Sequence, residues 1–140
     1  MHEDGLFSPE TIEDAREQFE QVGPAAQLTV KETAKAMAFD REEYHERVTD
    51  DVVTTARNAL FSSLLKVTVG TREEFDDWCA AHDEYDVVEA GSDSVDHVVW
   101  HVAPFANTVV AATFQNEEAA AVATLRRQAF GRIYRETLSL

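Results

Sequence analysis

Four side chains of metal-binding type lie close enough in the sequence to suggest one site. Cys79 and His82 are three residues apart in an amphipathic pattern, so a helix would place both on one face. His97 and His101 alternate with apolar residues, so a strand would point both to one side. A straight strand separates these histidines by about 13 Å, whereas zinc–nitrogen bonds are about 2 Å. We therefore expect no metal site, and histidines hydrogen-bonded to the backbone or to neighbours such as Asp96 and Thr113.

Arg126 is a second candidate, because it lies on the apolar side of the last predicted helix. At about 100° per residue, the apolar arc of that helix contains Val122, Leu125, Ala129, Phe130, Ile133 and Tyr134. A guanidinium on such a face needs a partner. Arg126 either forms a structural ion pair with an acid such as Asp96, or binds an anionic ligand together with His97 and His101.

Residues 28–48 resemble the helix-turn-helix unit that reads DNA. Ala34 lies where that unit has a small residue, and Ala38 lies where its turn commonly has glycine. Phosphate contacts would come from Lys31, Lys35, Arg41, His45 and Arg47. The second helix also carries Glu42, Glu43 and Glu46, which would face the phosphates, so a plain helical hairpin is the preferred interpretation.

No pattern in the chain indicates catalysis. The serines lie in no nucleophile motif, and the five glycines are isolated, so no phosphate-binding loop is present. Cys79 is expected to be a small residue of the hydrophobic core. We expect no catalytic residue and no cofactor.

Helical signals fill the first half. Ser8 and Pro9 predict the start of a helix whose apolar positions are Ile12, Ala15, Phe19 and Val22, and Gly23-Pro24 predicts its end. A capping box from Thr29 to Glu32 predicts a second helix, through Met37. Asp40 and Thr49 predict the caps of a third and a fourth helix.

The second half has the order β-α-β-β-β-α. Strands are predicted at 66–70, 86–90, 95–103 and 108–115, with a tight turn at 104–107. Helices are predicted at 72–83, from a capping box at Thr71, and at 117–137. We expect one α+β domain over 1–140, with a helical part (1–62) and an α+β part (63–140) whose four-stranded sheet is mostly antiparallel. Both helices should cover one face of that sheet, and the Trp100 face should be core.

The net charge of the chain predicts the environment in which the protein works. With 27 acids against 12 bases, the net charge is −15, and only three of the bases are lysine. This balance is typical of a salt-in halophile, whose acidic surface holds hydrated cations. It disfavours nucleic acid and anionic membranes as partners. A single cysteine and no long apolar run predict a reducing cytoplasm and no membrane span.

The chain also resembles an uncharacterised haloarchaeal family, a domain of unknown function. The resemblance rests on residues 40–49, 59–65, 70–75 and 124–135. It implies the habitat and no activity. The sequence therefore favours a non-catalytic binding or protein-interaction domain whose partner is a second copy or an unknown protein. The alternatives are a DNA-binding regulator acting through residues 29–48, and a small-ligand or metal-binding protein.

Overall fold

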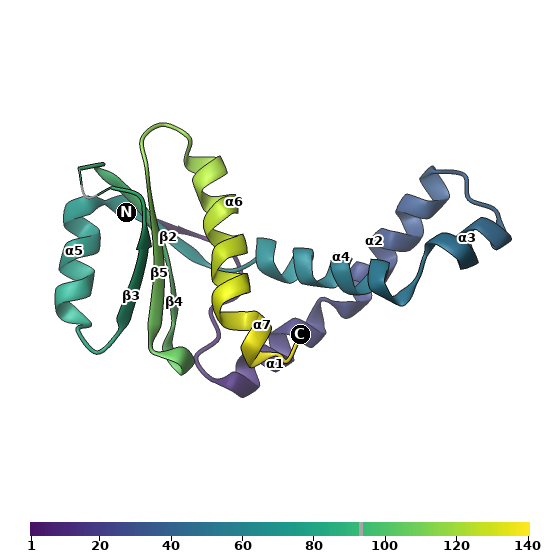
Figure 1. Cartoon of the computed structure of the whole chain (residues 1–140), viewed down its shortest axis with the longest axis horizontal. Helices are drawn as coiled ribbons and strands as arrows, with labels where there is room; N and C mark the ends of the chain where they lie inside the picture. The colour runs from purple at the N-terminus through teal and green to yellow at the C-terminus, as the bar shows by residue number, and fades with distance from the viewer. Residues whose placement is uncertain (93) are drawn as a thin grey trace.

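In the computed structural model, which describes residues 1–92 and 94–140, a five-stranded sheet carries helices on both faces and a helical arm on one side (Figure 1). The strands are β1 (His2–Asp4), β2 (Val67–Thr71), β3 (Asp86–Ala90), β4 (His97–Ala103) and β5 (Thr108–Phe114). Their order across the sheet is β1-β2-β4-β5-β3, and only the β3–β5 pair is parallel. The predicted α+β class is confirmed, and residues 2–4 add a fifth strand to the four expected.

The sheet is built around the β4–β5 hairpin, whose turn is a 3₁₀ segment (Pro104–Ala106) followed by Asn107 in the left-handed conformation. Side chains on alternate faces of β4 enter different cores. Val98 and Trp100 pack with Phe75 of α5 (Arg72–Ala81), whereas Val99 and Ala103 pack under α6 (Glu118–Ala129). The expectation that α5 and the last helix share one face is therefore wrong. Both faces of the hairpin are apolar and each needs a cover, as its near-continuous apolar run indicates. That run does not indicate which helix covers which face.

The larger core is centred on Phe61, which is fully buried near the end of α4 (Asp50–Ser63). Its ring lies 5.3 Å from Phe7, 5.4 Å from Phe19 of α1 (Ile12–Gln21) and 5.3 Å from Tyr134. Tyr134 belongs to a π-helical turn (Phe130–Tyr134) that links α6 to the short α7 (Arg135–Thr137). One aromatic ring thus joins the N-terminal segment, α1, α4 and the C-terminal helix.

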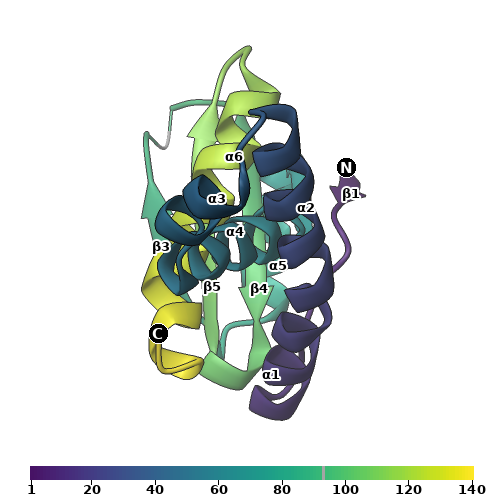
Figure 2. The same ribbon diagram turned by 90° about the vertical axis from the view of Figure 1, so that its right-hand side faces the viewer.

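The remaining helices, α2 (Gly23–Ala36) and α3 (Arg41–Arg47), form with the outer part of α4 an arm that projects from the sheet (Figures 1 and 2). Asp40 caps α3 as predicted, its carboxylate accepting from the Glu43 amide at 2.9 Å. Thr49 lies at the N-cap position of α4 as predicted, although its side chain makes no capping hydrogen bond. The boundaries of the first two helices are less regular. Helix α1 is capped by Thr11 instead of Ser8. It ends at Gln21, just before Gly23-Pro24 as predicted, but the same two residues also begin α2.

The predicted capping box at Thr29 does not form, because Thr29 lies inside α2. Its hydroxyl donates to the carbonyl of Ala25 at 2.8 Å, a bond within the helix. The capping box at Thr71 is confirmed: Thr71 accepts from the Glu74 amide, and the Glu74 carboxylate accepts from the Thr71 amide at 2.9 Å. No helix of the described residues has both the length and the apolar character needed to cross a membrane.

Candidate functional site

The two hairpin histidines lie in different environments. His101 is 1 % exposed, with Nδ1 2.6 Å from the Lys66 carbonyl and Nε2 2.7 Å from the Tyr134 hydroxyl. A carbonyl only accepts, so Nδ1 carries the proton and Tyr134 donates to Nε2. Burial lowers the pKa of His101 to about 4 and raises that of Tyr134. His97 is exposed at the strand end and stacks on Phe114 at 5.4 Å. His101 is thus a neutral, fully bonded core histidine.

Cys79 and His82 lie on the opposite face of the sheet from His101. Cys79 packs against the Trp100 core, and His82 stacks on Trp78 at 4.3 Å while its Nδ1 contacts the Trp78 carbonyl at 2.8 Å. Loss of solvent on burial raises the pKa of the Cys79 thiol, the reverse of what an activated thiolate needs. The four side chains do not meet, and no group of three or more His, Cys, Asp or Glu residues within 1–92 and 94–140 is arranged to hold a metal.

Arg126 is bound into the fold, with its side chain 14 % exposed. Its Nε donates to the Leu65 carbonyl at 2.8 Å, and its Nη2 donates to the Asp4 carbonyl at 3.1 Å and lies 3.6 Å from the Asp4 carboxylate. The acid beside it is therefore Asp4 and not Asp96. Arg126 fixes β1 and the entry to β2 against α6, so His97 and His101 do not form a site with it.

A pocket of about 530 Å³ opens beside Arg126, between α4 and the C-terminal helix. Its walls are Thr55, Asn58, Ser62 and Ser63 of α4, and Arg126, Arg127 and Arg135 of the facing helix. Apolar surface comes from Ala59, Ala123 and Phe130. Sequence reasoning identified Arg126 but not the pocket, because the residues of α4 that complete it are more than 60 positions away.

The structure brings together four of the five residues proposed for DNA binding. Lys31 and Lys35 of α2 line a pocket of about 570 Å³ with Arg41 and His45 of α3. Arg47 instead lies over the Phe39 ring, 5.8 Å from its centroid. Ala38 has φ +60°, the left-handed geometry for which the helix-turn-helix turn normally uses glycine. Tyr44 also lines this pocket, and Ala34 is buried between the helices.

A second groove, of about 610 Å³, runs along the arm between α2, α3 and the start of α4. Its apolar lining consists of Pro24, Leu28, Val30, Tyr44, Val48 and Val53. Leu28 is 59 % exposed and Tyr44 is 37 % exposed. We call this feature the arm groove.

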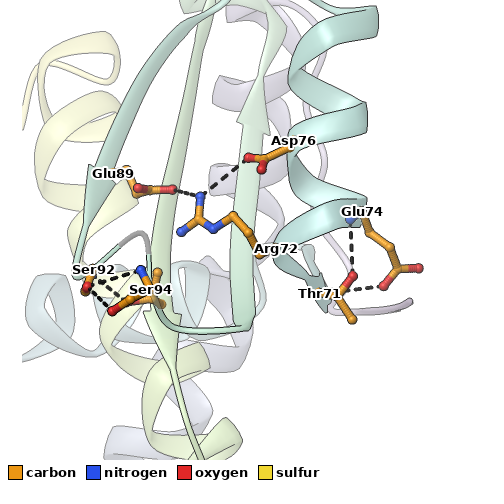
Figure 3. A network of polar contacts seen from close by, with 8 residues as sticks. Thr71, Arg72, Glu74, Asp76, Glu89, Ser92 and Ser94 are labelled. Carbon is orange, nitrogen blue, oxygen red and sulfur yellow. Dashed lines mark hydrogen bonds and ion pairs between the residues drawn. The ribbon is translucent and has the colours of Figure 1, made fainter.

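An ion-pair network of Arg72, Asp76 and Glu89 joins α5 to the neighbouring strand (Figure 3). Arg72 donates to Glu89 of β3 at 2.7 Å and lies 3.6 Å from Asp76, and the bond to Glu89 raises the pKa of its guanidinium. This network fastens the start of α5 to the edge strand β3. The pairing of Arg72 with Glu89 was not predicted from the sequence, because 17 positions separate the two residues.

Comparison with known proteins places the chain in a family without suggesting an activity. No curated protein matches it, and no solved structure matches it. One family model, described as a family of unknown function (DUF5809), covers residues 6–135, from the segment after β1 to the start of α7. The chain therefore belongs to the DUF5809 family of unknown function.

Proposed function

We propose that this protein is a non-catalytic interaction domain that pairs with a second copy of itself through the helical arm, in a salt-rich cytoplasm. The observation that carries the proposal is the arm groove, a furrow lined by both apolar and polar side chains in a part of the molecule that projects away from the sheet (Figure 1). Grooves of this kind between helices accept the apolar face of another helix. Leu28 and Tyr44 are the side chains that such a helix would cover.

Charge supports a second copy as the partner. Residues 23–63 carry seven acids and five bases, a net charge of −2, whereas the whole chain carries −15. The rest of the chain carries −13, and within it only residues 117–140 are not acidic, with four bases and three acids. Two copies that met through the other regions would bring strongly acidic surfaces together, at an electrostatic cost, whereas pairing through the arm avoids most of this repulsion.

Sedimentation equilibrium in molar KCl tests this proposal. The wild type should be a dimer, and Leu28→Glu should be a monomer because it places a charge inside the groove. Leu6→Glu is the matched control: Leu6 is 69 % exposed but lies outside the arm, so this variant should stay dimeric. A monomeric wild type, or equal dissociation of both variants, would refute pairing through the arm.

DNA binding by the same arm is the second candidate. It is favoured by the convergence of Lys31, Lys35 and Arg41 beside the turn at Ala38. Fluorescence anisotropy with a mixed-sequence duplex over a range of salt concentrations tests it. Binding should weaken with salt by a slope of about −0.9 per phosphate contacted, and Lys35→Gln should reduce that slope by about 1. Absence of binding at low salt would exclude this function.

A further inference from the structure

The pocket between α4 and the C-terminal helix differs in charge from the rest of the molecule. Although acids outnumber bases 27 to 12 in the chain, the pocket lining contains three arginines and no acid. Its volume of about 530 Å³ is within the usual range for small-molecule sites, about 300–1,000 Å³. This acidic protein therefore has a partly open pocket of metabolite size in which all the charged lining residues are basic.

Two of these arginines, Arg127 and Arg135, make few contacts that stabilise the fold. No carboxylate of residues 1–92 and 94–140 lies within ion-pairing distance of Arg127 or Arg135. Arg127 makes one long hydrogen bond, 3.4 Å to the Thr124 hydroxyl, and Arg135 lies over the Phe130 ring at 5.1 Å. In a chain so rich in carboxylates, these guanidinium groups still have free donors.

The backbone beside the pocket is irregular in a way that shapes it. Residues 130–134 form a π turn, in which the amide of Arg135 donates to the carbonyl of Phe130. This wider turn offsets Arg135 from a regular helical position, and π turns recur at functional sites. The α4 wall is fixed to this helix, since the Ser62 hydroxyl donates to the Arg126 carbonyl at 3.2 Å.

Asn58 gives a further polar group. Its side-chain oxygen is buried, and no donor among the described residues reaches it. An unsatisfied buried amide oxygen is costly. The side chain can present either its oxygen or its amino group here, because the two ends of the amide are related by a flip.

We propose that this pocket binds a small organic anion whose phosphate or carboxylate group is held by Arg127 and Arg135 and whose apolar body lies against Phe130, Ala59 and Ala123. A guanidinium group binds both kinds of oxyanion. Arg126 borders the site, but its Nε and Nη2 are occupied by Leu65 and Asp4. This site is separate from the arm groove and does not depend on pairing.

Four probes test the ligand class by isothermal titration: 1-naphthyl phosphate, 1-naphthoate, 1-naphthol and inorganic phosphate. At least one naphthyl anion should bind about tenfold more tightly than both naphthol and inorganic phosphate, the difference expected for one charged hydrogen bond. The tighter of the two anions identifies the phosphate or the carboxylate class. Naphthol binding as tightly as both anions, or no binding by any probe, would overturn the proposal.

The double variant Arg127→Gln/Arg135→Gln should weaken the preferred anion about tenfold or more. Arg132→Gln, singly and together with Arg16→Gln, is the matched control: Arg132 is on the same helix, and neither residue lines the pocket. Binding to both controls should stay within about twofold of the wild type. An equal loss in the charge-matched double control would show only a general charge effect and would refute the site. Leu28→Glu should bind the anion normally, which separates this result from the outcome for the arm.

Discussion

The Tyr134 hydroxyl donates a hydrogen bond to Nε2 of His101 at 2.7 Å, joining the central strand to the π turn of the last helical segment. The other ring nitrogen of His101 donates to the Lys66 carbonyl at 2.6 Å, so the imidazole links three segments of the chain. Because both partners are buried, His101 stays uncharged near neutral pH, and the pair acts as a structural cross-connection.

Removing this hydroxyl should lower stability. Tyr134→Phe keeps the ring contact with Phe61 but leaves Nε2 of His101 buried without a donor. The free energy of unfolding should fall by about 1–3 kcal/mol. Urea unfolding measures it, with Tyr85→Phe as the control because no described residue hydrogen-bonds that hydroxyl. If both variants lost the same stability, the His101 bond would not be the cause.

Acid should destabilise the fold through His101. An unfolded histidine titrates near about 6.5, whereas the folded pKa is about 4, so between these values the unfolded chain binds a proton that the folded chain does not. Stability should therefore fall as the pH drops from about 6.5 to about 4, by about 3 kcal/mol, with no further loss from this group below that range.

The measurement is urea unfolding across this range in molar salt, which screens the repulsion among the carboxylates. His97→Gln should keep the same slope, because His97 is exposed. Nitrogen-15 shifts of the His101 ring that reported protonation near neutral pH would contradict the prediction.

Replacing Arg126 should loosen the N-terminal strand. In Arg126→Lys the charge remains, but one ammonium cannot reproduce the separate bonds to the Leu65 and Asp4 carbonyls. We expect a loss of about 1–3 kcal/mol and faster hydrogen exchange at β1 and at the start of β2. Arg132→Lys should change neither. Unchanged exchange at β1 in Arg126→Lys would show that this contact does not hold the strand.

The N-terminal boundary of α1 can be tested by substituting two residues that carry hydroxyl groups. Thr11→Ala removes the side chain that accepts from the Asp14 amide at 3.0 Å and should cost about 1 kcal/mol. Ser8→Ala should change stability by less than about 0.5 kcal/mol, because Ser8 does not cap the helix. Thermal unfolding distinguishes the two variants, and the reverse order would support the boundary that the sequence alone suggested.

The sequence predicted the elements that rest on local signals. The capping box at Thr71, the cap at Asp40 and strand β3 at residues 86–90 all form as expected. All six residues of the apolar arc from Val122 to Tyr134 are buried. Each of these features depends on residues within a few turns or one strand of one another, so the local pattern contains the necessary information.

The predictions that were wrong have two causes. Some local sequence signals compete with each other, and some features depend on contacts between residues far apart in the sequence. Gly23-Pro24 ends one helix and also begins the next, because proline suits the first helical turn as well as an interruption. The placement of α5 and α6 on opposite faces depends on which apolar surface of the sheet each helix covers, which no local spacing encodes. The pocket required α4 to meet α6, two elements more than 50 residues apart.

The way the arm joins the body has a mechanical consequence. Helix α4 is anchored at its inner end, where Phe61 is buried and Ser62 bonds to the Arg126 carbonyl, while its outer end carries α2 and α3 (Figure 1). Its 14 residues span about 21 Å, so a rotation of about 10° at the anchored end moves the far end by about 4 Å. A rotation of α4 at its anchored end, next to the arginine-lined pocket, would therefore displace the tip of the arm by more than it displaces the pocket wall.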